Sequence, residues 1–164
     1  MSQKKEEAIQ KVMTEFESMA NLVLSQLDRL ESFFQSGETN LPEKLREEFD
    51  ANEKLIDQYE VKLSERIINT IVLFQPVASD IRQLIACYRI IINLERIGDY
   101  TINIVKFFSE IKNLELYEQM IGAINPMLIT STQMVTKSLL SFIHHDKEYA
   151  IWTIKNDDMV DDMN

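Results

Sequence analysis

The chain is poor in the residues that interrupt regular secondary structure. Its 164 residues include only three glycines and three prolines. An all-β fold needs many tight turns, and glycine and proline supply most of them. We therefore exclude that class and predict long helices. Because 45% of the residues are hydrophobic, a chain of this length can also bury a real core.

Cysteine and histidine are scarce as well. Cys87 is the single cysteine, so no disulfide can form within the chain. It stands in an apolar helical run, where a cysteine behaves as a small buried hydrophobe, and its isolation fits the cytosol. The two histidines, His144 and His145, have no glutamate three residues before them. The Glu-x-x-His pattern of carboxylate-bridged di-iron enzymes is therefore missing.

Motifs of catalysis, secretion and membrane insertion are missing too. The sequence contains no G-x-S-x-G, P-loop or G-x-G-x-x-G motif, and we predict that the chain is not an enzyme. The N-terminal stretch is charged and lacks the apolar segment of a signal peptide. Residues 119–136 carry no charge but contain Asn125 and Pro126, so they predict a core helix and not a membrane span. We expect a soluble, cytoplasmic protein.

Positive charge is in deficit. The chain has 17 lysines and arginines against 27 aspartates and glutamates, which gives a formal net charge of −10. A surface of this sign repels the phosphate backbone, so nucleic acid is not an expected partner. The acidic balance becomes informative if some of the carboxylates are neutralised by bound metal.

A few breaks divide the chain into five predicted helices. The breaks are Ser36–Pro42, Gln75-Pro76, Lys112-Asn113 and the turn His144–Asp146. The helices between them are predicted over residues 6–35, 42–74, 79–111, 114–143 and from 147 to the last residue, 164. Their apolar periodicity is helical throughout. In the fourth helix, three methionines spaced seven residues apart predict a core seam: Met120, Met127 and Met134.

A short acidic pattern recurs in the second and fifth helices. Asn52–Gln58 aligns with Asn156–Asp162, and both contain N-[E/D]-x-x-[I/V]-D after a long apolar helix and a break. We therefore predict two domains: an antiparallel three-helix bundle over residues 1–111, and an incomplete second repeat over residues 112–164. A sixth helix would be missing from the second repeat. Its exposed apolar faces predict a homodimer.

Two carboxylates interrupt the apolar stripe predicted for the third helix. Glu95 and Asp99 occupy two positions of this stripe, which continues at steps of three and four residues. Its other members are Ile81, Ile85, Tyr88, Ile92 and Ile102. Residues four apart lie about 6 Å apart along one side of a helix. Because two like charges repel and their partial burial is costly, a cation, a basic partner or protonation must compensate them.

The second helix carries a matching acidic row. Glu53, Asp57 and Glu60 border its apolar stripe at positions i, i+4 and i+7. In a three-helix bundle, the second and third helices are adjacent and antiparallel, so the pair Glu53–Asp57 would face the pair Glu95–Asp99. Such an all-oxygen site suits Mg, Ca, Mn or Fe. A solvated helix face is the alternative reading of this row.

Neighbouring residues of the third helix bear on the same question. Arg82, Arg89 and Arg96 recur every seven residues and form a row of their own. Arg96 could pair with Asp99, but it lies about 100° around the helix from Glu95 and is predicted to point outward. Gly98 costs about 1 kcal/mol relative to alanine in a helix, which indicates that a neighbouring helix approaches closely there.

These residues resemble the PhoU family of phosphate-uptake regulators. The matching residues are Gln75-Pro76-Val77-Ala78, Asp80, Arg82, the block Leu94-Glu95-Arg96-Ile97-Gly98-Asp99 and Asn103, preceded by the acidic motif NEKLID and followed by its second copy NDDMVD. The resemblance implies an all-α protein built from two PhoU-like, spectrin-like bundles. The counterpart of LERIGD in the second bundle is absent from this chain.

The resemblance also implies a function and a ligand set. It implies multinuclear iron or zinc sites, with Glu53, Asp57, Glu95 and Asp99 as ligands of the first site and Asp157 and Asp161 as half of a second. It further implies a non-enzymatic, cytoplasmic regulator that lowers phosphate uptake and starvation signalling by contacting a phosphate ABC transporter and its sensor histidine kinase.

Two alternatives stay open. The chain could be the cytoplasmic tail domain of a sodium-dependent phosphate cotransporter, or a metal-free helical interaction domain. The start Met1-Ser2 favours a free-standing protein over a transporter tail.

Overall fold

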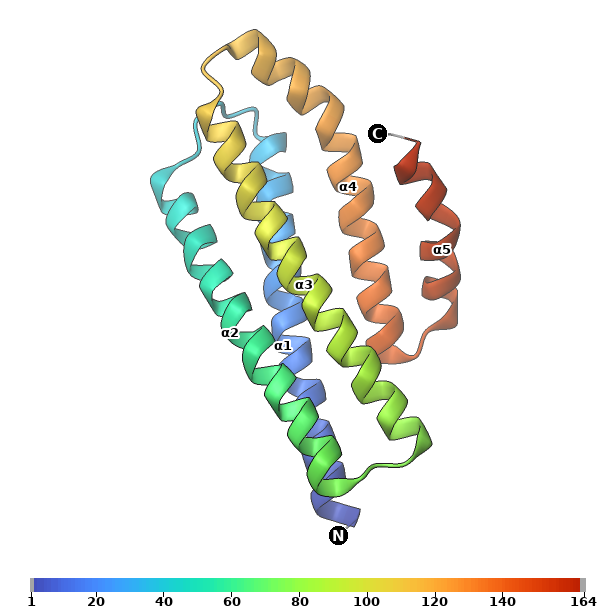
Figure 1. Ribbon diagram of the computed structural model, residues 1–164. Helices are drawn as coiled ribbons and strands as arrows, with labels where there is room; N and C mark the ends of the chain where they lie inside the picture. The colour runs from blue at the N-terminus through green and yellow to red at the C-terminus, as the bar shows by residue number, and fades with distance from the viewer. Residues whose placement is uncertain (1, 163–164) are drawn as a thin grey trace. The chain divides into compact units, whose positions relative to one another are not determined.

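The computed structural model describes residues 2–162 and folds them into five helices joined by short loops (Figure 1). The helices are α1 (Ser2–Gln35), α2 (Glu43–Phe74), α3 (Ala78–Glu110), α4 (Leu114–His144) and α5 (Lys147–Asp161). The all-α class and the five helices are confirmed. Four predicted ends coincide with the observed ones, four are displaced by one residue, and α1 begins four residues earlier than predicted. The last helix was predicted to continue to residue 164, but α5 ends at Asp161 with Asp162 as its C-cap, and residues 163–164 lie outside the described residues. Within them, no helix combines the length and the apolarity required to cross a membrane.

Side-chain capping explains the boundary between α4 and α5. His145 ends α4 in the left-handed region, at a φ of 55°. The Asp146 carboxylate then accepts hydrogen bonds from the backbone N–H groups of Glu148 and Tyr149, at 2.8 and 3.3 Å. These N–H groups have no partner within the helix, so the carboxylate stabilises the start of α5. The predicted turn at residues 144–146 is confirmed.

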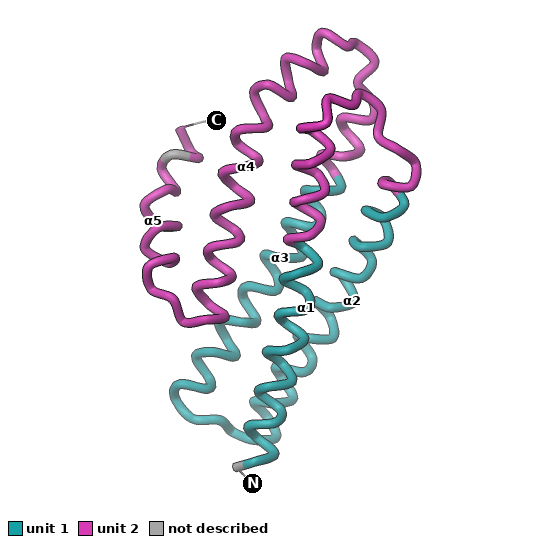
Figure 2. Tube along the Cα trace, turned by 180° about the vertical axis from the view of Figure 1, so that it is seen from behind, with its two compact units in different colours: residues 1–23, 47–102 teal, residues 24–46, 103–164 magenta. Residues whose placement is uncertain are grey.

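The chain divides into two compact units, which Figure 2 colours separately. Unit 1 consists of Met1–Val23 and Glu47–Ile102, and unit 2 consists of Leu24–Arg46 and Asn103–Asn164. These units are defined by compactness and do not test whether the sequence repeats. The division into two repeats, residues 1–111 and 112–164, therefore stays a prediction.

Unit 1 is a three-helix bundle formed by parts of α1, α2 and α3. An ion pair of 2.7 Å between Lys5 Nζ and Asp80 Oδ2 joins the first turns of α1 and α3, so these helices begin at the same end of the bundle and α2 runs between them in the opposite direction. In α1 every residue of the apolar row predicted by periodicity is buried: Val12, Phe16, Met19, Val23, Leu27, Leu30 and Phe34. Cys87 of α3 is also fully buried, as predicted, and burial raises the pKa of its thiol to about 12.

The predicted buried face of α3 is wrong by one residue. Ile81, Ile85 and Ile92 are 38%, 46% and 37% exposed. The buried row lies one position earlier for most of the helix and contains Leu84, Cys87, Ile91, Leu94 and Gly98, with Ile102 as the shared member. Because α3 is apolar on more than one side, periodicity fits two neighbouring rows equally well. Glu95 and Asp99 therefore lie beside the core and not within its central row.

The predicted methionine seam of α4 is also displaced. Met120, Met127 and Met134 are half-buried, whereas the buried positions are Tyr117, Leu128, Thr132 and Leu139. An aromatic contact within unit 2 explains why the face of α4 that contains Tyr117 is buried. The Tyr117 ring lies edge-on to Phe108, with ring centroids 5.7 Å apart. The Tyr117 hydroxyl also donates a 2.7 Å hydrogen bond to the Glu38 carbonyl. These contacts orient the first turn of α4.

Unit 2 keeps apolar side chains at its surface. Ile151 and Ile154 of α5 are 53% and 74% exposed. Apolar residues exposed singly are normal on a protein surface and only larger contiguous patches mark contact sites, so these two residues do not decide the oligomeric state. The homodimer stays a prediction.

Helices α2 and α3 of unit 1 pack closely at Gly98. A Cβ atom at this position would lie 3.1 Å from Cδ1 and 3.4 Å from Cγ2 of Ile56. Since Ile56 is only 1% exposed, its side chain has little room to move. The close approach predicted from Gly98 is confirmed.

We expect Gly98→Val to lower the free energy of unfolding by about 1–3 kcal/mol, because the added methyl groups overpack the contact with Ile56. Denaturant unfolding followed by circular dichroism measures the change. Gly98→Ala combined with Ile56→Val should be tolerated better than Gly98→Val, because the shorter valine removes the Cδ1 atom at 3.1 Å. Wild-type stability of Gly98→Val would contradict the role assigned to this glycine.

Candidate metal centre

Carboxylates of α2 and α3 converge on one side of unit 1. Glu53 and Asp57 of α2 and Asp99 of α3 each offer a carboxylate oxygen, and the three oxygens lie within 4.8 Å of one another. Four residues were predicted as ligands of the first site. These oxygen–oxygen distances show that the structure brings three of them together. A cation among them would be coordinated by oxygen only, as hard and borderline divalent cations prefer.

Glu95, the fourth predicted ligand, belongs to the same cluster electrostatically. Burial raises the pKa of Glu95, and the negative charges of Asp99, Asp57 and Glu60 raise it further, against a smaller opposing effect of Arg96. The Glu95 carboxyl group therefore interacts with acids on its own helix and on α2. We call Glu53, Asp57, Glu60, Glu95 and Asp99 the carboxylate cluster.

The cluster lies between the core and the solvent. Asp57 is exposed, and the other four members are half-buried: Glu53, Glu60, Glu95 and Asp99. An ion from solvent can reach such a site without opening the bundle. The Gly98 contact described above explains why acids of two helices meet here, because it holds α3 against α2 one residue away from Asp99.

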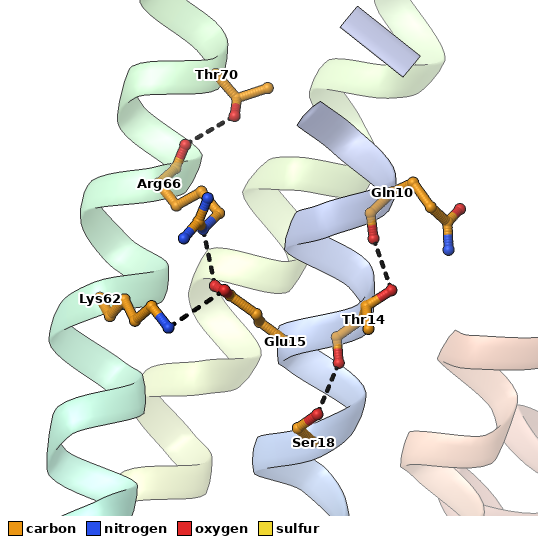
Figure 3. A network of polar contacts seen from close by, with 7 residues as sticks. All are labelled: Gln10, Thr14, Glu15, Ser18, Lys62, Arg66 and Thr70. Carbon is orange, nitrogen blue, oxygen red and sulfur yellow. Dashed lines mark hydrogen bonds and ion pairs between the residues drawn. The ribbon is translucent and has the colours of Figure 1, made fainter. Parts of the chain in front are cut away.

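Three cations of α2 and α3 near the cluster make their contacts elsewhere. Arg66 Nε and Lys62 Nζ of α2 lie 2.8 and 3.3 Å from the carboxylate oxygens of Glu15 on α1 (Figure 3). Arg96 is exposed, and its Nη2 lies 3.4 Å from the Tyr100 hydroxyl on the same helix. The outward direction predicted for Arg96 is confirmed. These three cations therefore do not neutralise the cluster by direct ion pairs.

Glu60 was part of the predicted acidic row but not of the predicted ligand set. The structure links it to the cluster, because its charge contributes to the raised pKa of Glu95. Ser64 Oγ donates a 3.0 Å hydrogen bond to Glu60 Oε1 and orients the carboxylate. The i+7 spacing from Glu53 was the sequence signal for this residue.

The structure does not bring the second predicted pair into a comparable group. Asp157 and Asp161 are exposed on α5 in unit 2. Among the described residues, no third acid, histidine or cysteine joins them at the spacing found in unit 1. Their role as half of a second site stays a prediction.

The fold and the cluster define a class: an all-α bundle whose adjacent antiparallel helices present a group of converging carboxylates. A family model described as the PhoU domain matches residues 16–108, more than half of the chain. The chain belongs to the PhoU family. The match contains both acidic motifs of unit 1, so the resemblance seen in the sequence is confirmed.

Curated relatives agree with this assignment. A protein from Aquifex aeolicus is 36% identical over 123 residues, which cover 73% of this chain and 54% of the relative. A protein from Methanothermobacter thermautotrophicus is 29% identical over 74% of this chain and 55% of its own length, and one from Xylella fastidiosa (strain Temecula1) is 26% identical over 95% and 62%. All three are named as phosphate-specific transport system accessory protein PhoU homologs. The chain spans about half the length of the first two.

Glu95 predicts a distinctive pH dependence for the metal-free protein. Because its pKa is raised in the folded state, the folded protein binds the proton more tightly than the unfolded chain does. Ionised Glu95 therefore destabilises the fold. This destabilisation begins as the pH rises through the ordinary glutamate pKa, about 4.3, and is complete above the raised folded pKa.

We therefore expect Glu95→Gln to be more stable than the wild type at neutral pH in the presence of a chelator, with the difference vanishing as the pH falls to about 4. Thermal melts across this range measure the difference. Glu110→Gln, a change of an exposed glutamate at the end of the same helix, is the matched control. A stability difference that does not change with pH would disprove the electrostatic account of Glu95.

Proposed function

We propose that this chain is the metal-binding part of a regulatory adaptor for phosphate transport. The observation that supports the proposal most directly is the carboxylate cluster, in which acids of two helices converge without a direct ion pair to the nearby cations. Membership of the PhoU family and the names of the relatives supply the connection with phosphate transport.

The proposed ligands of the bound metal are Glu53, Asp57, Glu95 and Asp99. Their like charges repel, so a cation that binds among them removes a destabilising interaction and links α2 to α3. The all-carboxylate donors suit Mn, Mg or Ca, and the family resemblance favours iron or zinc. The metal has a structural role in this proposal, and the protein acts as an adaptor and not as an enzyme.

The proposed action is cytoplasmic and takes place through protein contacts. The metal-loaded bundle contacts a phosphate ABC transporter and its sensor histidine kinase, and thereby lowers phosphate uptake and the response to phosphate starvation. Metal binding keeps the α2–α3 surface in one conformation for these contacts.

Added metal is expected to stabilise the wild-type protein after treatment with a chelator. A ligand that binds only the folded state stabilises it by about 2.7 kcal/mol at a concentration one hundred times its Kd. Melting curves with Mn²⁺, Fe²⁺ and Zn²⁺, together with elemental analysis of untagged protein, measure the effect and the stoichiometry. Glu95→Gln with Asp99→Asn should abolish the shift.

The α5 pair supplies a matched control. Asp157→Asn with Asp161→Asn removes two acids with the same i, i+4 spacing outside the cluster and should leave the shift of unit 1 unchanged. An equal metal-induced shift in the Glu95→Gln, Asp99→Asn variant would disprove the metal site at the carboxylate cluster, and the absence of any shift in the wild type would support the metal-free interaction domain.

The regulatory part of the proposal has its own test. In a phosphate-starved bacterium that lacks its own PhoU protein, expression of this chain should lower the activity of a phosphate-starvation reporter. The Glu95→Gln, Asp99→Asn variant, expressed to the same level, should lower it less, because its adaptor surface is not held by metal. Reporter activity that neither protein changes would contradict a regulatory role for this chain.

A further inference from the structure

The outer side of α3 carries a row of exposed side chains that the carboxylate cluster does not use. Arginine and isoleucine alternate along it at steps of three and four residues: Arg82, Ile85, Arg89, Ile92 and Arg96. Steps of this kind keep the residues on one face of a helix over about 21 Å. We call these five residues the arginine–isoleucine row. All of them belong to unit 1, in the helix labelled α3 in Figure 1.

The isoleucines of the row are exposed although they are apolar. Ile85 is 46% and Ile92 is 37% exposed, and neighbouring Ile81 is 38% exposed. A shallow hollow lies around the small side chain of Ala86 and is lined by residues 81, 82, 85, 89 and 90. An apolar side chain of a partner fits such a hollow, so the row offers both apolar contact and shape.

The arginines of the row are available to a partner. Arg82 and Arg89 are exposed, and among residues 2–162 neither forms an ion pair. Asp80, the acid nearest to Arg82 in sequence, is paired with Lys5 at 2.7 Å. Arginine binds carboxylates through two parallel hydrogen bonds and is common among the residues that dominate interface energies. Unpaired arginines are notable in a chain with a net charge of −10.

We propose that the arginine–isoleucine row docks an acidic amphipathic helix of a partner protein. The partner helix presents carboxylates and apolar side chains at the same alternating steps, so that acids meet Arg82 and Arg89 while apolar residues meet Ile85 and Ile92. Docking of one helix face on another uses this spacing. The inference deepens the adaptor role proposed above by naming a contact surface, and it rests on that role only for the identity of the partner.

The charge of the chain disfavours two other occupants. A protein with a net charge of −10 is repelled by the extended negative charge of anionic lipid surfaces and of nucleic acid. A short acidic helix contacts only the row, where the arginines attract its carboxylates. The row also ends next to Glu95 and Asp99, whose charges repel a continuous polyanion. An acidic helix with apolar residues between its acids avoids both effects.

The test uses a fluorescent helical peptide of about 18 residues, long enough to cover the row, with glutamate and leucine at alternating steps of three and four. Fluorescence anisotropy measures its binding to the full chain. We expect micromolar binding by the wild type and a loss of about tenfold or more in Arg82→Glu with Arg89→Glu. A peptide with lysine in place of glutamate should restore binding to that variant.

Two control variants make the result specific. Lys106→Glu with Lys112→Glu changes the net charge equally at exposed positions outside the row and should leave binding unchanged. Ile85→Ser with Ile92→Ser keeps the arginines and should weaken binding about tenfold, because the apolar contacts are lost. Unchanged binding in the isoleucine variant would show non-specific charge attraction and overturn the proposal.

The remaining outcomes are equally decisive. Absence of peptide binding by the wild type, or binding that the arginine variant does not reduce, overturns the proposal. Binding of the wild type to phosphatidylglycerol vesicles, lost in the arginine variant and without peptide binding, assigns the row to a membrane and also overturns it. Glu53→Gln with Asp57→Asn should bind the peptide like the wild type, so a failure of the metal site is distinguished from a failure of this surface.

Discussion

The close contact of Gly98 with Ile56 is the constraint on which the rest of unit 1 depends. It lets α3 lie against α2 at a distance that a side chain on residue 98 would not permit. The residues beside this contact are acidic on both helices, so close packing of an apolar core places like charges together. The favourable burial of Ile56 and Leu94 thus forces an unfavourable electrostatic arrangement at the edge of the core.

Within residues 2–162, the cations near that arrangement make their direct contacts elsewhere, and Arg96 offsets only part of the repulsion at Glu95. Lys62 and Arg66 hold α2 to α1 through Glu15, and Arg96 bonds to Tyr100 on the outside of α3. Cations that serve the bundle are therefore separated from the acids that face one another. A cluster organised in this way is suited to an ion from solvent, and the remaining unpaired arginines of α3 are suited to an acidic protein. Two neighbouring sides of α3 thus carry opposite charge: acids beside α2 and arginines toward solvent.

Much of the fold could be predicted from the sequence because its signals are local. Scarce glycine and proline mark the helix ends, and the row from Val12 to Phe34 fits only one face of α1, since polar residues occupy the other sides of that helix. The acidic motifs on α2 and α3 could be recognised for the same reason: residues four apart on a helix always share a side, whatever surrounds them. Gly98 was informative because a helix interior disfavours glycine unless something approaches it closely.

The sequence by itself determined the helices, the family and the acids that pair along each helix. Only the tertiary structure decided which of two apolar rows of α3 is buried, because both rows satisfy the helical period and packing against Ile56 selects the one containing Gly98. It also decided that Tyr117 is buried at the start of α4 while the methionines stay half-buried. The Phe108 ring that Tyr117 contacts belongs to another helix, so the sequence of α4 alone could not predict this contact. Likewise, Glu53 and Asp57 meet Asp99 through a contact between helices, whereas Asp157 and Asp161, with the same local spacing, find no such neighbour among the described residues.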